Sequence, residues 1–336
     1  QVILFERQAR VGRKLQATGN GRCNLTNLHA NDRGYHGEAP EFVSHALQAF
    51  GVEETLAWFQ DLGLFTVAEP SGRVYPYSDQ ANSVVDVLRF GLEKENIQWK
   101  PGFEVSRLHR QNGGFLVEGN GERIPCDRVI VACGGLAGTK LGGSMSGYRL
   151  LRSMGHRVTK LRPALVQLKC GWSGVTALKG VRTNCHASIY HNETLHAQSE
   201  GELQFTEYGL SGPVIFEISR DVCQGGGNWI CRLDFLPMLS HEDIMERLGK
   251  RTHTNLTAQE LLTGILHNRL GRVIIKSVGI SENTPISQLT QEQLHAVCHE
   301  IKAFDITLTE PLGMDSAQVT AGGILTEDFN PKTMES

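Results

Sequence analysis

A short apolar segment that ends in a carboxylate constrains this chain more than any other feature. Residues 2–5 read Val-Ile-Leu-Phe and are followed directly by Glu6. A short apolar run bounded by a charge predicts a buried strand of a parallel sheet. An acidic residue at the end of such a strand is where a dinucleotide-binding fold holds a ribose hydroxyl. The pattern therefore predicts a nucleotide site at Glu6.

The stretch over residues 13–27, RKLQATGNGRCNLTN, carries residue types that a phosphate site needs. Gly19 and Gly21 allow a ligand to approach the backbone closely, and Arg13, Lys14 and Arg22 can meet phosphate oxygens. Taken one at a time, these residues are also consistent with turn glycines and a solvated basic loop. The specificity of the signal lies in the whole string.

That string, "ERxxRxGRKLxxTGNGRCNLTN" from Glu6 onward, resembles the start of the BaiN-type flavoproteins. They are also described as the aminoacetone oxidase family of FAD/NAD(P)-dependent oxidoreductases, in which this segment wraps the FAD ribose and pyrophosphate. The resemblance implies that Glu6 binds the adenosine ribose. It also implies that six residues lie along the pyrophosphate and flavin: Arg13, Lys14, Gly19, Asn20, Gly21 and Arg22. Cys23 and Asn24 are expected close by.

Two more motifs match the same family. "GELxFTxxGLSGP" covers residues 201–213, and "QVTxGGI" at residues 318–324 is followed by "NPKTMES". In the family the first lies near the flavin, so residues 206–213 are expected to form one wall of the active site. The candidates for contact with substrate are Gln318, Thr320 and Arg73, although Arg73 also fits a surface residue of a hairpin.

Residues 128–135 form an apolar run that enters the pair Gly134–Gly135. The run predicts a buried strand, and it resembles the second FAD-contacting strand of flavoproteins with two dinucleotide-binding domains, where small residues let the backbone approach the cofactor. The resemblance also implies that the backbone of Val105 bonds the adenine. Cys23 is expected to be a buried, inert thiol rather than a redox-active one.

The predicted fold class is α/β: a Rossmann-like FAD-binding fold of the type with two dinucleotide-binding domains, with an antiparallel β domain and a small helical insertion. We expect the FAD-binding domain over residues 1–160 and 315–336, the β domain over 161–240 and 301–314, and the insertion over 241–300. A dinucleotide fold has its glycine turn about 20 residues before the acidic residue. The natural chain is therefore expected to extend beyond the N-terminus of this sequence, and the family resemblance implies a further strand and a second glycine-rich turn beyond its C-terminus.

Local patterns predict the elements in more detail. Helical spacing of apolar residues predicts two helices over 41–62 and one over 83–92. Turn residues predict a hairpin of 64–67 with 73–76, and a meander of strands over 97–99, 104–108, 114–118 and 122–125. Strands are expected over 165–168, 187–190 and 230–233, in an antiparallel sheet or small barrel. Capping boxes at Ser240, Thr257 and Thr290 each predict an amphipathic helix in the insertion.

Composition excludes several classes of function. The net charge of −3 over 336 residues provides no attraction to nucleic acid or to an anionic membrane. No apolar run approaches the roughly 20 residues that span a bilayer, and no signal peptide is visible. The eight cysteines form no CxxC pair, so neither a disulfide framework nor a metal site is predicted. A cytoplasmic protein with small-molecule partners is expected.

The resemblance implies an FAD-dependent oxidoreductase that transfers hydride between the flavin and a small organic substrate, with NAD(P)H as a possible donor. Family members are linked to reduction of conjugated double bonds and to oxidation of small amines, and the sequence does not choose between them. Two alternatives stay open: a cofactor-free binding protein of flavoprotein fold, and an RNA-modifying flavoenzyme. The charge of the chain and the lack of a basic, aromatic-rich patch count against the second.

Overall fold

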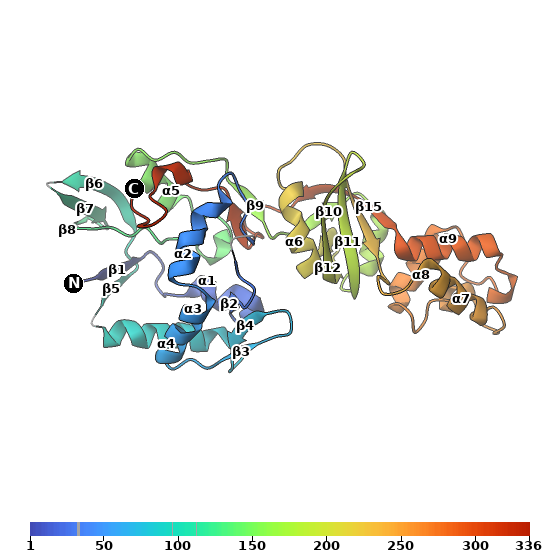
Figure 1. Ribbon diagram of the computed structural model, residues 1–336. Helices are drawn as coiled ribbons and strands as arrows, with labels where there is room; N and C mark the ends of the chain where they lie inside the picture. The colour runs from blue at the N-terminus through green and yellow to red at the C-terminus, as the bar shows by residue number, and fades with distance from the viewer. Residues whose placement is uncertain (32–33, 96, 112) are drawn as a thin grey trace. The chain divides into compact units, whose positions relative to one another are not determined.

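A computed structural model of the protein describes residues 1–31, 34–95, 97–111 and 113–336. The chain forms two compact units, one of residues 1–161 with 322–336 and the other of residues 162–321 (Figure 1). In the described part of the chain, no helix combines the length and the apolar character needed to cross a membrane.

The first unit contains a parallel pair of strands, β1 (Ile3–Glu6) and β5 (Gln98–Pro101), with Leu4 opposite Trp99. Parallel neighbours need a long connection, and the one here includes α1 (Arg13–Ala17), α2 (Ser44–Ala49), α3 (Val52–Asp61) and α4 (Ala81–Lys94). The prediction of a parallel strand at residues 2–6 is confirmed, although β1 is half-buried. The assignment of residues 97–99 to the antiparallel meander was wrong, because their partner is β1.

Two antiparallel sheets complete the strands of this unit. The hairpin of β3 (Thr66–Ala68) and β4 (Arg73–Pro76) is confirmed, and β2 (Thr26–Asn27) adds to the other edge of β4. The meander of β6 (Val105–Gln111), β7 (Gly114–Gly119) and β8 (Glu122–Cys126) is also confirmed. The β3–β4 hairpin and the β6–β8 meander form between segments close in sequence, so turn residues were a sufficient guide to them. Strand β2 comes from much earlier in the chain, and its pairing with β4 was not predicted.

Residues 128–135 are not a strand in the described structure, and the prediction of a buried strand here was wrong. Ile130 is 91% exposed. An apolar run becomes a stable strand only where neighbours bond its backbone groups, and no described strand pairs with this one. The run then leads to α5 (Ser146–Ser153), which has Met154 as its C-cap. Gly155 has a positive φ of 99°, the left-handed conformation that glycine commonly takes just beyond the end of a helix.

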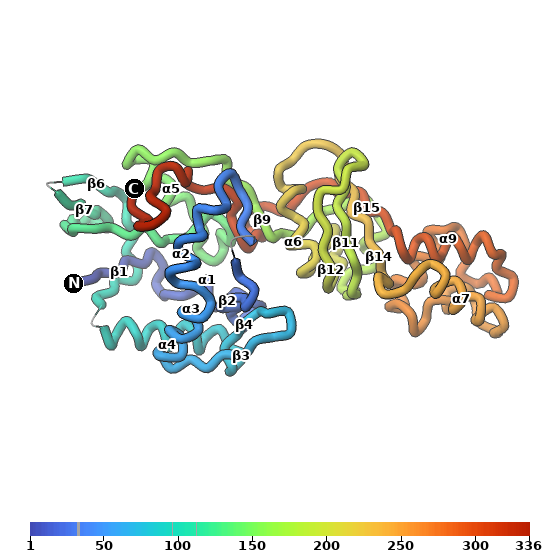
Figure 2. Tube along the Cα trace, in the orientation of Figure 1, coloured from blue at the N-terminus to red at the C-terminus, as the bar shows by residue number. Residues whose placement is uncertain are grey.

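The last residues of the chain lie beside the segment that follows α5 (Figure 2). The Leu325 amide donates to the Arg157 carbonyl at 3.1 Å, and the Arg157 guanidinium pairs with Glu327 and Asp328 at 3.0 Å each. Hydrogen bonds from Arg157 hold the pKa of Asp328 below its ordinary value. These contacts join residues 322–336 to the first unit.

The second unit is built on a closed barrel with the strand order β10-β13-β12-β11-β14-β15. This confirms the small antiparallel barrel as one of the two predicted arrangements. The barrel strands are β10 (Leu168–Cys170), β11 (Arg182–His191), β12 (Thr194–Phe205), β13 (Gly209–Ser211), β14 (Trp229–Asp234) and β15 (Phe304–Pro311). Helix α6 (Pro213–Val222) follows β13 and has Gly212 as its N-cap.

The helical segment of this unit contains α7 (His241–Arg251), α8 (Asn268–Ser277) and α9 (Gln291–Lys302). All three capping boxes are present. The one at Thr257 starts only a three-residue 3-10 turn, Ala258–Glu260, so the amphipathic helix expected after it was wrong. Leu261 and Leu262 are nevertheless buried, and one hydrophobic core runs through the barrel and the helices. The division into separate β and helical domains stays a prediction.

The strand expected over residues 165–168 is broken at Leu165, which has a positive φ of 51°. The amide of the next residue, Val166, donates to the Ser219 hydroxyl at 3.2 Å instead of to a strand. The chain therefore forms β9 (Arg162–Ala164), which pairs with β16 (Val319–Ala321), and then β10.

All eight cysteines are free, and five of them are buried. Burial raises the pKa of the Cys185 thiol to about 12, and raises the pKa of Cys223 and Cys298 to about 11. Cys23 packs with Leu64, Ala81 and Val84. Cys133, next to the Gly134–Gly135 pair, is the exposed thiol.

Candidate functional site

The glycine-rich loop after α1 has an unusual backbone. Gly19, Asn20, Gly21 and Cys23 all have positive φ angles, between 55° and 87°. The amide of Cys23 donates to the Thr18 carbonyl at 3.0 Å, which closes the loop on itself. Non-glycine residues in this region are energetically unfavourable and persist only where the surroundings hold them. The loop therefore has a defined backbone conformation, although Asn20, Gly21 and Asn24 are exposed.

The Arg22 side chain anchors this loop to the neighbouring hairpin. Its guanidinium donates to Glu69 Oε1 at 2.9 Å and to Asp79 Oδ1, and it lies 3.9 Å from the centre of the Tyr75 ring. The bonds to Asp79 and Glu69 raise the pKa of Arg22 above its ordinary value. We call these four residues the Arg22 clamp. Sequence reasoning placed Arg22 along the pyrophosphate and missed its three partners.

The loop residue Asn24 is bound to the same hairpin. With its amide nitrogen turned toward the carbonyls, it donates to Thr26 O at 2.9 Å and to Val74 O at 3.2 Å. The next amide, that of Leu25, also donates to Val74 O, at 2.8 Å. The predicted loop residues are thus held on β4 by both the main chain and the side chains.

Glu6 lies at the end of β1, where residues 102–103 meet it. The amide of Phe103 donates to the Glu6 carbonyl at 2.9 Å, and the amide of Gln8 donates to Glu6 Oε1 at 2.7 Å. Across residues that the structure describes, no partner bonds the second carboxylate oxygen, Oε2. Glu6 also borders a largely apolar cavity of about 520 Å³ between β1, α1, α3 and α4.

The segment after β1 is bonded to the predicted glycine segment, about 130 residues later in the chain. The Arg7 guanidinium donates to the Gly142 carbonyl at 2.7 Å, and Lys14 Nζ donates to the Ala137 carbonyl at 3.1 Å. Gly135 O accepts from the Ser144 amide at 3.1 Å, which folds residues 135–144 into a compact loop. A Cβ placed on Gly134 would meet no described atom within 4 Å, so the backbone is open there.

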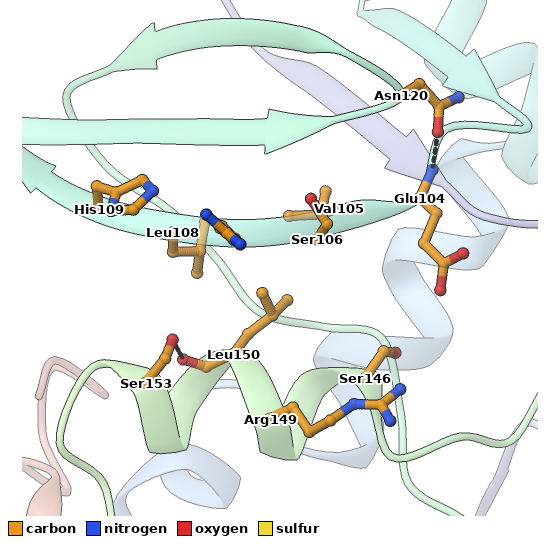
Figure 3. A pocket seen from close by; sticks show the side chains of 11 residues that line it. Glu104, Val105, Ser106, Leu108, His109, Asn120, Ser146, Arg149, Leu150 and Ser153 are labelled. Carbon is orange, nitrogen blue, oxygen red and sulfur yellow. Dashed lines mark hydrogen bonds between the residues drawn. The ribbon is translucent and has the colours of Figure 1, made fainter.

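Val105 begins β6, which is an edge strand of its sheet. The pairing with β7 shifts between Val105 and Arg107, as at a β-bulge, so the regular ladder is interrupted at this point. A cavity of about 690 Å³ runs along this edge, between β6 and α5 (Figure 3). Leu108 and Leu150 supply its apolar surface, and Arg107 and Arg149 also line it.

The structure brings the predicted cofactor residues together in the first unit: Glu6, Arg13, Lys14, residues 19–24, Val105, Gly134 and Gly135. Arg73, on β4, belongs to the same unit. Gln318 and Thr320 belong to the second unit, where the Gln318 amide donates to the Leu165 carbonyl at 3.2 Å. In the 206–213 segment, the Tyr208 hydroxyl donates to Gln167 Oε1 at 3.2 Å.

Comparison with known proteins gives a match over the whole chain. Residues 1–336 match the family described as "HI0933-like protein Rossmann domain". A "3-dehydro-bile acid delta(4,6)-reductase" of Clostridium scindens is 40% identical over 343 residues, covering 100% of this chain and 83% of the relative. A "Ribosomal RNA dihydrouridine synthase" of Escherichia coli is 26% identical over 336 residues, covering 100% of this chain and 82% of the relative.

A solved flavoenzyme, described as the open conformation of a flavocytochrome c3 fumarate reductase, aligns with 96% of this chain and 67% of its own. Its TM-score of 0.33 and identity of 12% are too low to carry an argument. The family match and the 40% identical reductase are sufficient to assign the family. They agree with the resemblance and with the Rossmann-like fold class that the motifs predicted. The chain belongs to the HI0933-like Rossmann family and is an oxidoreductase of the flavoprotein type.

Proposed function

We propose that this protein binds FAD in its first unit and transfers a hydride between the flavin and a small organic substrate. The observation that supports the proposal best is the set of bonds that joins three distant segments, at residues 6–24, 102–105 and 134–144. Each of these segments carries a residue that the family resemblance assigns to the cofactor.

The donor groups in the first unit suit the parts of FAD. Glu6 Oε2 would accept from the ribose hydroxyls, and the open edge of β6 at Val105 would bond the adenine. Arg13 and Lys14 would hold the pyrophosphate, because in the described structure they bond only neutral oxygens, Gln8 Oε1 and Ala137 O. The open backbone at Gly134 would allow the cofactor to approach the Gly134–Gly135 pair closely. FAD, when bound, supplies the carrier of the hydride.

The substrate class follows from the 40% identical relative, which is named a delta(4,6)-reductase of a 3-dehydro-bile acid. We infer that this protein reduces a carbon–carbon double bond conjugated with a ketone, with NAD(P)H as electron donor. A hydride and a proton add across the double bond while NAD(P)H becomes NAD(P)⁺. Gln318, Thr320 and Arg73 are the residues proposed to contact the substrate, and the free cysteines favour a reducing, cytoplasmic location.

The direct test is a titration of the protein with FAD, followed by fluorescence quenching. We expect saturable binding, and NAD(P)H consumption when a conjugated steroid ketone is added to the loaded protein under anaerobic conditions. Saturable FAD binding without turnover of any conjugated ketone would contradict the substrate class. Absence of FAD binding would contradict the proposed function itself and would favour the cofactor-free binding protein.

An RNA substrate is the competing function, and the 26% identical Escherichia coli relative named as a ribosomal RNA dihydrouridine synthase supports it. The proposed function predicts no specific RNA binding. A filter-binding assay with ribosomal RNA decides the point, because affinity that falls steeply with salt would show phosphate contacts. Salt-dependent binding together with NAD(P)H-dependent reduction of uridine would replace the small-molecule proposal.

Thiol labelling tests the location of the cofactor without a substrate. Cys133 is exposed and precedes Gly134, so we expect it to react first with a thiol reagent and FAD to slow that reaction about tenfold. Cys170 is half-buried in the second unit and serves as the control, because its slower rate should not change with FAD. An unchanged Cys133 rate in protein saturated with FAD would place the cofactor away from Gly134 and Gly135.

A further inference from the structure

The Arg22 clamp joins the glycine-rich loop to residues 69–79, which lie 47 to 57 residues later in the chain. Arg22 is on the glycine-rich loop, Glu69 and Tyr75 are on the β3–β4 hairpin, and Asp79 precedes α4. Arg22 thus has two carboxylate partners and an aromatic ring against its guanidinium plane. Planar stacking combined with charged hydrogen bonds is the arrangement in which arginine holds a fixed geometry best.

Backbone strain is concentrated around the clamp. Asn20 and Cys23 flank Arg22 with φ angles of 57° and 62°, and Asp79 has a φ of 55°. Within the described residues, eight non-glycine residues have a positive φ, and three of them meet here. Such conformations cluster at functional sites and persist only where contacts hold them in place. The Arg22 side chain therefore links the strained loop to Asp79, which is itself in a strained backbone conformation.

The charges of the clamp argue against phosphate binding by Arg22. One guanidinium faces two carboxylates, so the cluster has a net negative charge and does not attract an anion. Arg13 and Lys14 have only neutral acceptors as partners in the portion of the chain that the structure covers. Their positive charges are available to a ligand, whereas the charge of Arg22 is neutralised within the protein.

We infer that Glu69 and Asp79 are positioning residues, which act through Arg22 to hold the Gly19–Cys23 loop in the shape that receives FAD. Arg13 and Lys14 supply the attraction for the pyrophosphate. This division of roles rests on the proposed FAD function. It differs from the sequence-based hypothesis, in which Arg13, Lys14 and Arg22 all met the phosphates.

The first experiment needs no cofactor. In the double variant Glu69→Gln, Asp79→Asn the loop keeps Arg22 as a trypsin site but loses its charged partners. We expect limited trypsin digestion of the native protein to cleave after Arg22 about tenfold faster in this variant. Glu310→Gln removes the surface pair with Lys169 in the second unit and is the matched control, with no change in cleavage at Arg22 expected. Thermal unfolding of each variant separates loop opening from global loss of structure.

The second experiment measures FAD affinity at low and high salt. The double clamp variant is expected to bind FAD about tenfold more weakly with the salt dependence of the wild type, because the ligand charges remain. Arg13→Gln with Lys14→Gln should also weaken binding and should flatten the salt dependence. Arg22→Lys should bind FAD more weakly than the wild type, because lysine lacks the planar guanidinium that bonds Glu69 and Asp79 together.

The outcomes separate the inference from the proposed function. Unchanged cleavage after Arg22 in the double clamp variant would overturn the inference, as would FAD affinity equal to that of the wild type. A salt dependence that flattens in Arg22→Ala as it does in the Arg13, Lys14 variant would also overturn it, because Arg22 would then meet phosphate. If the wild type binds no FAD, the proposed function fails, while the trypsin result still decides whether the clamp holds the loop.

Discussion

Replacing Gly209 with alanine is expected to lower the free energy of unfolding of the second unit by about 3 kcal/mol. Gly209 is buried in β13, opposite Lys169 of β10. A Cβ at this position would lie 2.1 Å from the Leu168 carbonyl oxygen and 2.8 Å from the Lys169 Cα. Both atoms belong to the backbone, so no side chain can rotate away. The substitution must separate β10 from β13 and open the barrel.

Hydrogen exchange of peptides from β11 and β12 measures this effect in the barrel alone, since unfolding of the first unit does not contribute to it. Gly249→Ala is the matched control in the same unit, because Gly249 lies in α7 and a Cβ there would meet no described atom within 4 Å. It should raise stability by about 0.5–1 kcal/mol. Equal protection of the barrel peptides in both variants would show that β10 and β13 do not approach so closely.

Elements that depend on neighbours in sequence were predictable. The capping boxes at Ser240 and Thr290 use contacts three residues apart, and both start helices as expected. The β6–β8 meander is set by short turns for the same reason.

Elements that depend on distant partners were not predictable. Residues 98–101 pair with β1, which lies about 95 residues earlier, and local pattern could not show this. Residues 128–135 have the composition of a buried strand, but in the described structure they have no strand partner. The break at Leu165 depends on the Ser219 hydroxyl, 53 residues away from its partner Val166. The composition of a segment indicates which secondary structure it favours, but contacts with distant residues determine which secondary structure it forms.

The candidate site shows the same division. The string from Glu6 to Asn27 located the loop, because its residues are contiguous. The partners of Arg22 are 47 and 57 residues away, and nothing in the sequence around Glu69 or Asp79 marks them as acceptors for one guanidinium. A charged residue inside a glycine-rich loop therefore has two possible roles, toward the ligand or toward the protein. Only the fold distinguishes between them.

The Glu6 carboxylate gives the sharpest test of the proposed nucleotide site. We expect Glu6→Ala to weaken FAD binding by roughly 1–3 kcal/mol, or about 5- to 150-fold, through loss of charged hydrogen bonds to the ribose. Glu6→Gln should have a smaller effect, because its amide oxygen still accepts from the Gln8 amide and from one hydroxyl. Isothermal titration with FAD measures both changes.

Glu95→Ala is the matched control for Glu6, because Glu95 is a second carboxylate that borders the same 520 Å³ cavity but lies at the end of α4. Removing Glu95 changes the net charge by the same amount as removing Glu6. We expect FAD affinity to stay within twofold of the wild type, because the effect of an exposed charge is weak, at roughly 0.4 kcal/mol. Equal losses at Glu6 and Glu95 would mean that the charge of the cavity matters and not a bond to the ribose. A loss confined to Glu6, larger for alanine than for glutamine, requires a hydrogen-bonded ligand at the end of β1. Such a ligand would lie beside the other proposed cofactor segments, because the Phe103 amide bonds the Glu6 carbonyl and Lys14 bonds the Ala137 carbonyl.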